Sequence, residues 1–209
     1  MIERLFVQRQ KVYVIDDDEI VCDVVRELLL TVGIESEGYL SAEEYLGAYN
    51  QEMHGCIISD IRMARISGFM LMDKLKTLGC KMPVVFLTGY ADVEMAVQGI
   101  KNGAFDFIEK PFNKHVLLET INQALEKNTE DLRARAVSSK NDECINKLTS
   151  REKSVFDLLM QGESSKGIAK TLSISPRTVD VHRQHILEKF NLNSISELMA
   201  RILGSAPSL

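Results

Sequence analysis

The segment VYVIDDD, residues 12–18, decides the fold expected for this chain. A short run of β-branched and aromatic residues ends abruptly in three acids. Runs of this length and composition favour a buried strand. From Ile20 to Val32 the apolar residues recur at helical spacing. The segment therefore predicts a strand followed by a helix, with acids at the carboxyl end of the strand.

The strand-then-helix arrangement repeats along the chain, both before and after a further acid, Asp60. Further apolar runs occupy residues 56–58, 83–87 and 105–108, and a weaker strand, 35–40, fits between the first two. Helical patterns fill the gaps, at residues 70–78 and 91–102 and in a stretch opened by Ser41 with Glu44 three residues on. Alternating strands and helices with buried strands predict a five-stranded parallel, doubly wound sheet covered by helices on both faces.

Reactive side chains follow these strands where they end. The first run stops at Asp16-Asp17-Asp18, the second reaches Asp60 and the third reaches Thr88, while Lys110 follows the fourth by two residues. Chemistry in parallel α/β sheets gathers at the carboxyl ends of the strands. We therefore expect these side chains to meet in space.

Charge indicates what such a group could do. Neighbouring carboxylates stay ionised together only if a cation balances them, and an all-oxygen set favours Mg²⁺. A carboxylate can accept a phosphoryl group as a nucleophile, and a lysine ammonium would neutralise the charge on the phosphoryl oxygens. Isolated acids or lysines at strand ends are usually structural, so the prediction depends on their occurring together.

The segments VYVIDDDEIV, CIISDIRM, VVFLTGYAD and FDFIEKPF resemble the receiver domain of two-component response regulators, over residues 10–126. The resemblance implies that Asp60 is the phosphoacceptor. It implies that Asp16 and Asp17 serve Mg²⁺ together with Asp60, and that the backbone carbonyl of Arg62 is a further metal ligand.

The resemblance also assigns residues that respond to the phosphoryl group. It implies that Thr88 and Lys110 contact this group, that Phe107 is a switch aromatic which rotates inward as Thr88 shifts, and that the Lys110–Pro111 bond is cis. One position departs from the pattern, because the family usually carries proline where this chain has Ala64. We expect the loop beside Asp60 to be less rigid for that reason.

The last part of the chain has no obvious strand and reads as four short helices. Leu148–Glu152 opens a helix to Met160, Ser164/Ser165 opens one to Leu172, and Ser194 caps the last, with Glu197 three residues later. Between them Ser175 is placed as N-cap and Pro176 as the first residue of a helix that runs to Phe190. Short helices joined by tight turns suit a helix-turn-helix unit.

The stretch LTSREKSVFDLLMQGESSKGIAKTLSISPRTVDVHRQHILEKFNL resembles the LuxR-type helix-turn-helix of the FixJ/NarL family. The resemblance implies that the helix from Pro176 to Phe190 enters the major groove of double-stranded DNA. By analogy, the base-facing residues are Asp180, Val181 and Gln184. The phosphate-contact candidates are Ser164, Lys166, Thr178, Arg183 and Lys189, and Arg177 lies on the same helix.

Composition separates the chain into parts with different partners. The 209 residues carry a net charge of −5, divided as +2 (eight basic, six acidic) for residues 148–209 and −7 (17 basic, 24 acidic) for the remainder. We predict a receiver domain at 1–126, a linker at 127–147 and a DNA-binding domain at 148–209. The polar part of the linker, 137–147, is a candidate hinge, and a helical linker is the alternative. The four cysteines lack the spacing of a zinc site or a disulfide framework.

The N-terminus lacks the apolar core of a signal peptide, and no apolar run is long enough to span a membrane. These two features predict a cytoplasmic protein.

The two resemblances together predict a transcription regulator without turnover of an external substrate. Its expected partners are a sensor histidine kinase, double-stranded DNA, RNA polymerase and a second copy of the chain after phosphorylation, with transcriptional activation favoured. Two alternatives remain. A phosphatase with an aspartyl nucleophile would need a second acid two residues after Asp60, where this chain has Arg62. A constitutive DNA binder would carry a degenerate receiver that reads protein contacts or a ligand.

Overall fold

The computed structural model of the chain describes residues 10–89 and 99–204. The chain divides into two compact units, Met1–Asp131 and Leu132–Leu209, and each is described here by itself. Among the described residues, no helix has both the length and the apolar character needed to cross a membrane.

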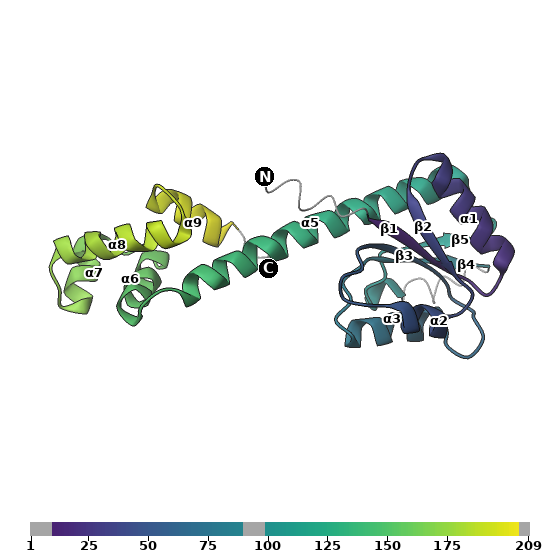
Figure 1. Cartoon of the computed structure of the whole chain (residues 1–209), viewed down its shortest axis with the longest axis horizontal. Helices are drawn as coiled ribbons and strands as arrows, with labels where there is room; N and C mark the ends of the chain where they lie inside the picture. The colour runs from purple at the N-terminus through teal and green to yellow at the C-terminus, as the bar shows by residue number, and fades with distance from the viewer. Residues whose placement is uncertain (1–9, 90–98, 205–209) are drawn as a thin grey trace. The chain divides into compact units, whose positions relative to one another are not determined.

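The first unit is built on a five-stranded sheet in the order β2-β1-β3-β4-β5, with every neighbouring pair parallel. This confirms the predicted α/β fold. Figure 1 shows the strands side by side. Their bounds are β1 Lys11–Ile15, β2 Glu35–Tyr39, β3 Gly55–Asp60, β4 Val84–Thr88 and β5 Asp106–Glu109.

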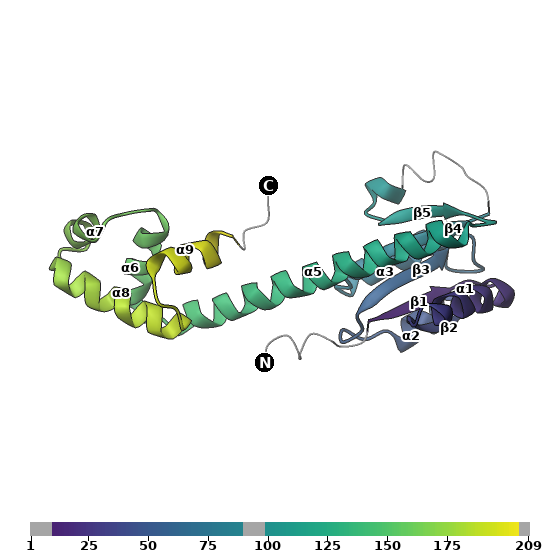
Figure 2. The same ribbon diagram turned by 90° about the horizontal axis from the view of Figure 1, so that it is seen from above.

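Helices cover both faces of this sheet (Figures 1 and 2). The face covered by α1 (Glu19–Thr31) and α5 (Lys114–Asn146) buries Leu29 and Leu117 against the apolar side chains of β1, β3 and β4. The opposite face is covered by α2 (Ala42–Ala48) and α3 (Gly68–Thr77), which bury Tyr45 and Leu71. Because both faces are covered, β3 is buried along its whole length, as its unbroken apolar run predicts.

Side-chain caps set where the helices begin. The carboxylate of Asp18 accepts from the backbone N–H of Ile20 and starts α1, and the hydroxyl of Ser41 accepts from Glu44 N and starts α2 as predicted. Ser67 caps α3 in the same way. Of the helix predicted at 91–102, residues 91–98 lie outside the described residues, and 99–101 are helical.

Helix α5 continues through nearly all of the predicted linker. It is continuous from Lys114 to Asn146, so the polar stretch expected to be a hinge, 137–147, is helical almost to its end. Its residues contact both units in turn: Asn128 accepts hydrogen bonds from Gln10 and from Gly55 N in the first unit, and Asn141 accepts one from Arg201 in the second. The helical alternative left open for the linker therefore holds in the structure, where these anchoring contacts stabilise the helix.

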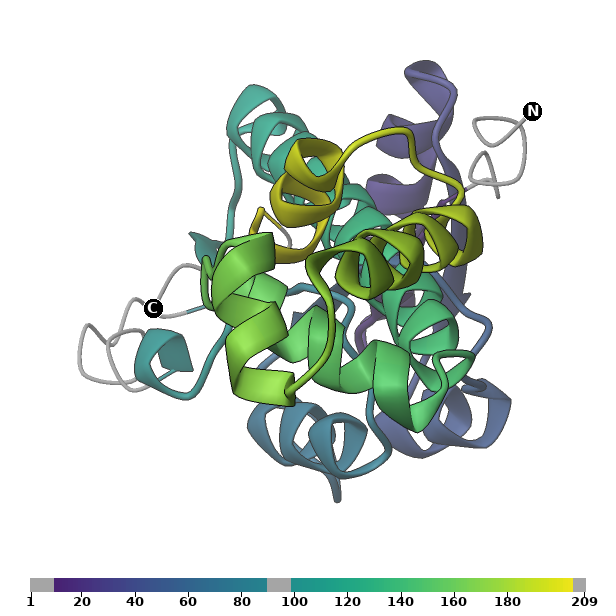
Figure 3. The same ribbon diagram turned by 90° about the vertical axis from the view of Figure 1, so that its left-hand side faces the viewer.

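The second unit contains the four expected helices, seen from another side in Figure 3. They are α6 Ser150–Met160, α7 Ser165–Leu172, α8 Pro176–Phe190 and α9 Ile195–Leu203. Their N-caps are Thr149, Ser164, Ser175 and Ser194, the last two as predicted, and Thr149 and Glu152 form a full capping box. Side chains from all four helices form one core, with Phe156 stacked on Phe190.

Candidate functional site

The strand register aligns the reactive residues at one edge of the sheet. Ile15 pairs with Ser59, so the acids after β1 stand beside Asp60 at the end of β3. Asp60 pairs with Leu87, which places Thr88 at the end of the adjacent β4. Lys110 follows β5, and its backbone N–H donates to the carbonyl of Thr88. The parallel topology therefore delivers the juxtaposition that the strand ends predicted.

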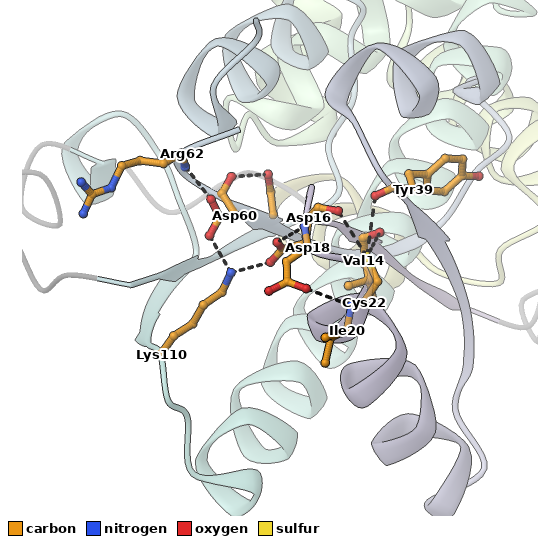
Figure 4. A network of polar contacts seen from close by, with 10 residues as sticks. Val14, Asp16, Asp18, Ile20, Cys22, Tyr39, Asp60, Arg62 and Lys110 are labelled. Carbon is orange, nitrogen blue, oxygen red and sulfur yellow. Dashed lines mark hydrogen bonds and ion pairs between the residues drawn. The ribbon is translucent and has the colours of Figure 1, made fainter. Parts of the chain in front are cut away.

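Lys110 joins two buried carboxylates (Figure 4). Its Nζ lies 2.5 Å from Asp16 Oδ2 and 2.7 Å from Asp60 Oδ1. Asp16 and Asp60 are 1% and 7% exposed, so charge on either needs a close partner. The second oxygen of Asp60 accepts from the backbone N–H of Arg62 at 2.6 Å. The Lys110–Pro111 peptide bond is cis, in agreement with the resemblance.

The site is short of positive charge. Burial raises the pKa of Asp16, the nearby Asp60 carboxylate adds to the increase, and the hydrogen bonds from Lys110 and from Asp18 N only partly oppose it. Burial alone would lower the pKa of Lys110, but its hydrogen bonds to Asp16 and Asp60 outweigh burial and raise it. Two buried carboxylates, Asp16 and Asp60, thus share the Lys110 ammonium.

The donor atoms at this edge fit a hard divalent cation. Asp16, Asp17, Asp60 and the Arg62 carbonyl offer oxygens only, the preferred ligands of Mg²⁺, which usually keeps several waters and takes few carboxylates. Within residues 10–89 and 99–204, no three His, Cys, Asp or Glu side chains stand close enough to hold a metal on their own. Asp17 is exposed, and its Oδ2 accepts from the backbone N–H of Ala64 at 3.3 Å.

Phe107 packs into an aromatic cluster on the face covered by α3. Its ring centroid lies 5.2 Å from that of Phe86 and 6.2 Å from that of Phe69. The ring is half-buried, whereas Phe86 is fully buried. Phe86 and Phe107 are partners across β4 and β5.

Most of the predicted DNA-contacting residues are exposed on α7 and α8. Ser164 is the N-cap of α7. The side chains open to solvent are Lys166, Arg177, Thr178, Asp180, Val181 and Gln184. Asp180 takes part in a small network, because its Oδ1 accepts from the hydroxyl of Ser165 at 3.1 Å and lies 3.8 Å from Arg183, which also donates to Ser165. Helix α8 is the second helix of the helix-turn-helix.

Lys189, one of the predicted DNA-contacting residues, makes hydrogen bonds within the second unit. Its Nζ lies 2.6 Å from Glu152 Oε2 and 2.9 Å from the carbonyl of Lys147. Burial disfavours the Glu152 charge, but the hydrogen bonds from Lys189 and from Thr149 N and Oγ1 outweigh it and lower the pKa of Glu152 to about 2. The lysine therefore ties α8 to α6, a role that sequence reasoning missed.

Sequence reasoning also missed two glycines that pack against the site. Gly68 begins α3, and a Cβ there would collide with the backbone oxygen of Asp60. Gly99 lies against the rings of Phe69 and Phe107. The available signal was an isolated glycine within a helical pattern, which often marks close packing.

Fold and site together define a class of protein, in which an α/β unit with acidic side chains at the carboxyl edge of its sheet is joined to a helix-turn-helix unit. Residues 12–122 match the family described as response regulator receiver domain, and residues 146–202 match bacterial regulatory proteins of the luxR family. The chain belongs to the two-component response regulators with a LuxR-type DNA-binding domain, and it is a transcriptional regulator.

Relatives resemble the chain over nearly its whole length. It is 38% identical over 188 residues to the transcriptional regulatory protein TdiR of Thauera aromatica, covering 90% of this chain and 83% of TdiR. It is 38% identical over 199 residues to FixJ of Azorhizobium caulinodans, covering 94% of each. Among solved structures, the response regulator StyR matches with a TM-score of 0.81 and 36% identity, over 94% of this chain and 99% of StyR. Full-length FixJ from B. japonicum matches with a TM-score of 0.59 and 34% identity, over 94% of this chain and 97% of FixJ.

Proposed function

We propose that Asp60 accepts a phosphoryl group from a sensor histidine kinase and that this event controls DNA binding by α8. The observation that carries the proposal is the setting of Asp60, a buried carboxylate at the end of β3 whose two oxygens face the Lys110 ammonium and the Arg62 amide. Receiver domains in general take their phosphoryl group at this site with Mg²⁺.

The transfer balances as a simple displacement. One carboxylate oxygen of Asp60 attacks phosphorus, the bond from phosphorus to the kinase histidine nitrogen breaks, and the imidazole leaves with the bonding electron pair. Lys110, 2.7 Å from Asp60, stabilises the charge on the phosphoryl oxygens, and we assign the hydroxyl of Thr88 to hydrogen-bond the product. Asp16, Asp17, Asp60 and the Arg62 carbonyl would hold Mg²⁺, which supplies further charge neutralisation.

Phosphorylation then shifts a two-state equilibrium in the first unit. We assign Thr88 and Phe107 to the responding residues, and we expect the phosphorylated chain to form a homodimer. Two linked recognition helices would bind adjacent half-sites more tightly than one.

In the second unit of each copy, Asp180, Val181 and Gln184 are the proposed base readers. Ser164, Lys166, Arg177, Thr178 and Arg183 are proposed for phosphates, whereas Lys189 is committed to Glu152. We propose activation of transcription through contact with RNA polymerase, and the domain bounds 1–126 and 148–209 with residues 127–147 as linker.

The deciding experiment compares wild type with Asp60→Asn, each treated with a small phosphodonor and Mg²⁺. We expect wild type to gain one phosphoryl group, to dimerise in light scattering and to protect specific DNA in genome-wide footprinting, and we expect Asp60→Asn to do none of these. Asp73→Asn is the matched control, because it makes the same chemical change at an exposed position on α3. Equal dimerisation and DNA protection by Asp60→Asn and wild type would refute the proposal.

The same experiment addresses the alternatives. A constitutive DNA binder would protect its sites without the phosphodonor. A phosphatase would release phosphate from an external monoester. Arg62 occupies the position where such an enzyme needs an acid, and Figure 4 shows its guanidinium directed away from Asp60.

A further inference from the structure

Three phenylalanine rings, from α3, β4 and β5, pack together on the face of the sheet that α3 covers. The ring centroids of Phe69 and Phe86 are 5.0 Å apart, those of Phe86 and Phe107 are 5.2 Å apart, and those of Phe69 and Phe107 are 6.2 Å apart. These distances lie in the range of favourable aromatic contacts. The Phe107 ring is therefore directed into the unit, toward the side chains of α3 and β4.

Gly99 supplies the space that the Phe107 ring occupies. Residue 99 is buried and helical. A Cβ at this position would lie 2.8 Å from Phe69 Cε1 and 2.8 Å from Phe107 Cε2, and closer still to Phe107 Cζ. Real Cβ atoms essentially never show contacts this short, so a methyl group at residue 99 and the present ring position exclude each other.

The cluster also reaches the phosphoacceptor. Gly68, at the start of α3, fits so tightly that a Cβ there would meet both the backbone oxygen of Asp60 and, at 2.8 Å, the Phe86 ring. The rings of Phe86 and Phe107 then continue this packing to Gly99. A contiguous set of packed groups thus connects Asp60 with Gly99, which is a physical route for coupling but not evidence of it.

We propose that Gly99 is a positioning residue for the Phe107 ring, and that its missing side chain favours the inward ring and with it the phosphorylated state. The inference rests on the proposed function, in which Phe107 responds to Asp60. Alanine favours a helix more than glycine does, so alanine at an unobstructed helical position should be tolerated well. At residue 99 the alanine methyl instead forces the ring out of the cluster.

The test uses the full-length chain with fluorine-labelled phenylalanine, and the signal of Phe107 is identified by its loss in Phe107→Leu. We expect Gly99→Ala to shift the Phe107 signal in the unphosphorylated protein. We also expect it to weaken dimerisation with beryllofluoride and Mg²⁺, a phosphoryl analogue, by about tenfold. Gly47→Ala is the matched control, because Gly47 lies in α2 with nothing within 4 Å of its Cβ position, and it should leave both measurements unchanged.

The double variant Gly99→Ala/Phe107→Leu separates the clash from a general packing defect. If the methyl acts on the ring, Gly99→Ala has no further effect on dimerisation once Phe107 is leucine. An unchanged Phe107 signal in Gly99→Ala, or an equal loss of dimerisation in the Phe107→Leu background, overturns the proposal. If Gly99→Ala alone fails to fold in circular dichroism while the double variant folds, the clash is supported; if both fail, it is rejected.

Failure of the proposed function gives a different result. If wild type takes up no phosphoryl group on Asp60, or does not dimerise, the switch is refuted. The fluorine signal of the unphosphorylated Gly99→Ala protein still reports whether residue 99 positions the ring.

Discussion

At the scale of single residues, Ala64 gives this chain a hydrogen bond that its relatives' usual proline could not make. Proline has no backbone N–H, whereas the N–H of Ala64 donates to Asp17 Oδ2 at 3.3 Å. Asp17 is exposed, so without this bond its carboxylate would sample several rotamers. The departure that we expected only to loosen the loop therefore also orients a proposed metal ligand.

Replacing Ala64 by proline should weaken Mg²⁺ binding by about threefold, the lower end of what one net hydrogen bond contributes. Ala64→Ser keeps the N–H and should bind Mg²⁺ like wild type. Both can be measured by titrating Mg²⁺ into the labelled protein and following backbone amide shifts in NMR. Equal affinity of the proline variant and wild type would show that the bond does not orient Asp17.

Gly68 has no room for a side chain because the backbone oxygen of Asp60 lies where a Cβ would stand. Backbone atoms move less readily than the end of a side chain, so Gly68→Ala should destabilise the first unit by about 1–3 kcal/mol, the usual cost of overpacking. Urea denaturation would measure this loss, with Gly47→Ala as the unobstructed control. A Gly68→Ala protein as stable as wild type would mean that α3 can withdraw from β3 at little cost.

At the scale of elements, Glu152 joins α6 to α8 through several contacts. Its Oε2 accepts from Thr149 N, Thr149 Oγ1 and Lys189 Nζ, and the His185 Nδ1 lies 3.8 Å from its other oxygen. This carboxylate therefore holds α8, the proposed recognition helix, against the rest of its unit.

Glu152→Gln should lower the free energy of unfolding of the second unit by about 2 kcal/mol at neutral pH, since it removes a charge-assisted hydrogen bond and leaves Lys189 without its anion. Glu188→Gln, at an exposed position of α8, should be nearly neutral. Chemical denaturation with circular dichroism detection would check both. A loss no larger than that of Glu188→Gln would show that the contacts contribute little.

The pH dependence of the same variant has a definite sign. The pKa of Glu152 is lowered to about 2 in the folded protein, below its value in an unfolded chain, so the folded state favours the ionised form. Its contribution is fully present above the unfolded pKa, about 4.3, and is lost as pH falls toward 2. The stability difference between wild type and Glu152→Gln should therefore shrink across this window. A difference that stayed constant there would contradict the assignment.

The sequence was most informative about elements whose signal is local. Strand ends such as Asp60, and caps such as Ser175 with Pro176, follow from patterns of a few residues, and the structure confirms them. The Lys110 bridge to Asp16 needed the strand order as well. Gly99 against Phe107, and Lys189 against Glu152, depend on side-chain packing between distant segments, which no local pattern records.

At the scale of the whole molecule, the two units divide within a helix. The division falls between Asp131 and Leu132, inside α5. The residues of α5 after it contribute to the second unit, because Asn141 accepts from Arg201 at 2.7 Å and Cys144 and Ile145 pack on its core. A DNA-binding domain cut at residue 148 would lack all of these contacts.

A fragment of residues 132–209 should therefore be more stable than one of residues 148–209, by about 2 kcal/mol, from the Arg201 hydrogen bond and the apolar burial combined. Asn141→Ala in the longer fragment isolates the hydrogen bond. Urea midpoints of the three proteins would give the comparison. Identical midpoints for the two fragments would place the boundary at residue 148, as the sequence predicted.

The shared helix also governs how such proteins can be recombined. A chimaera that exchanges one receiver for another has no loop at the division between the units, since every residue from Lys114 to Asn146 is helical. The crossover must keep Asn128 with the incoming sheet and Asn141 with the resident α9. That leaves a window of one dozen residues, 129–140, in which a gene fusion would inherit both sets of native contacts.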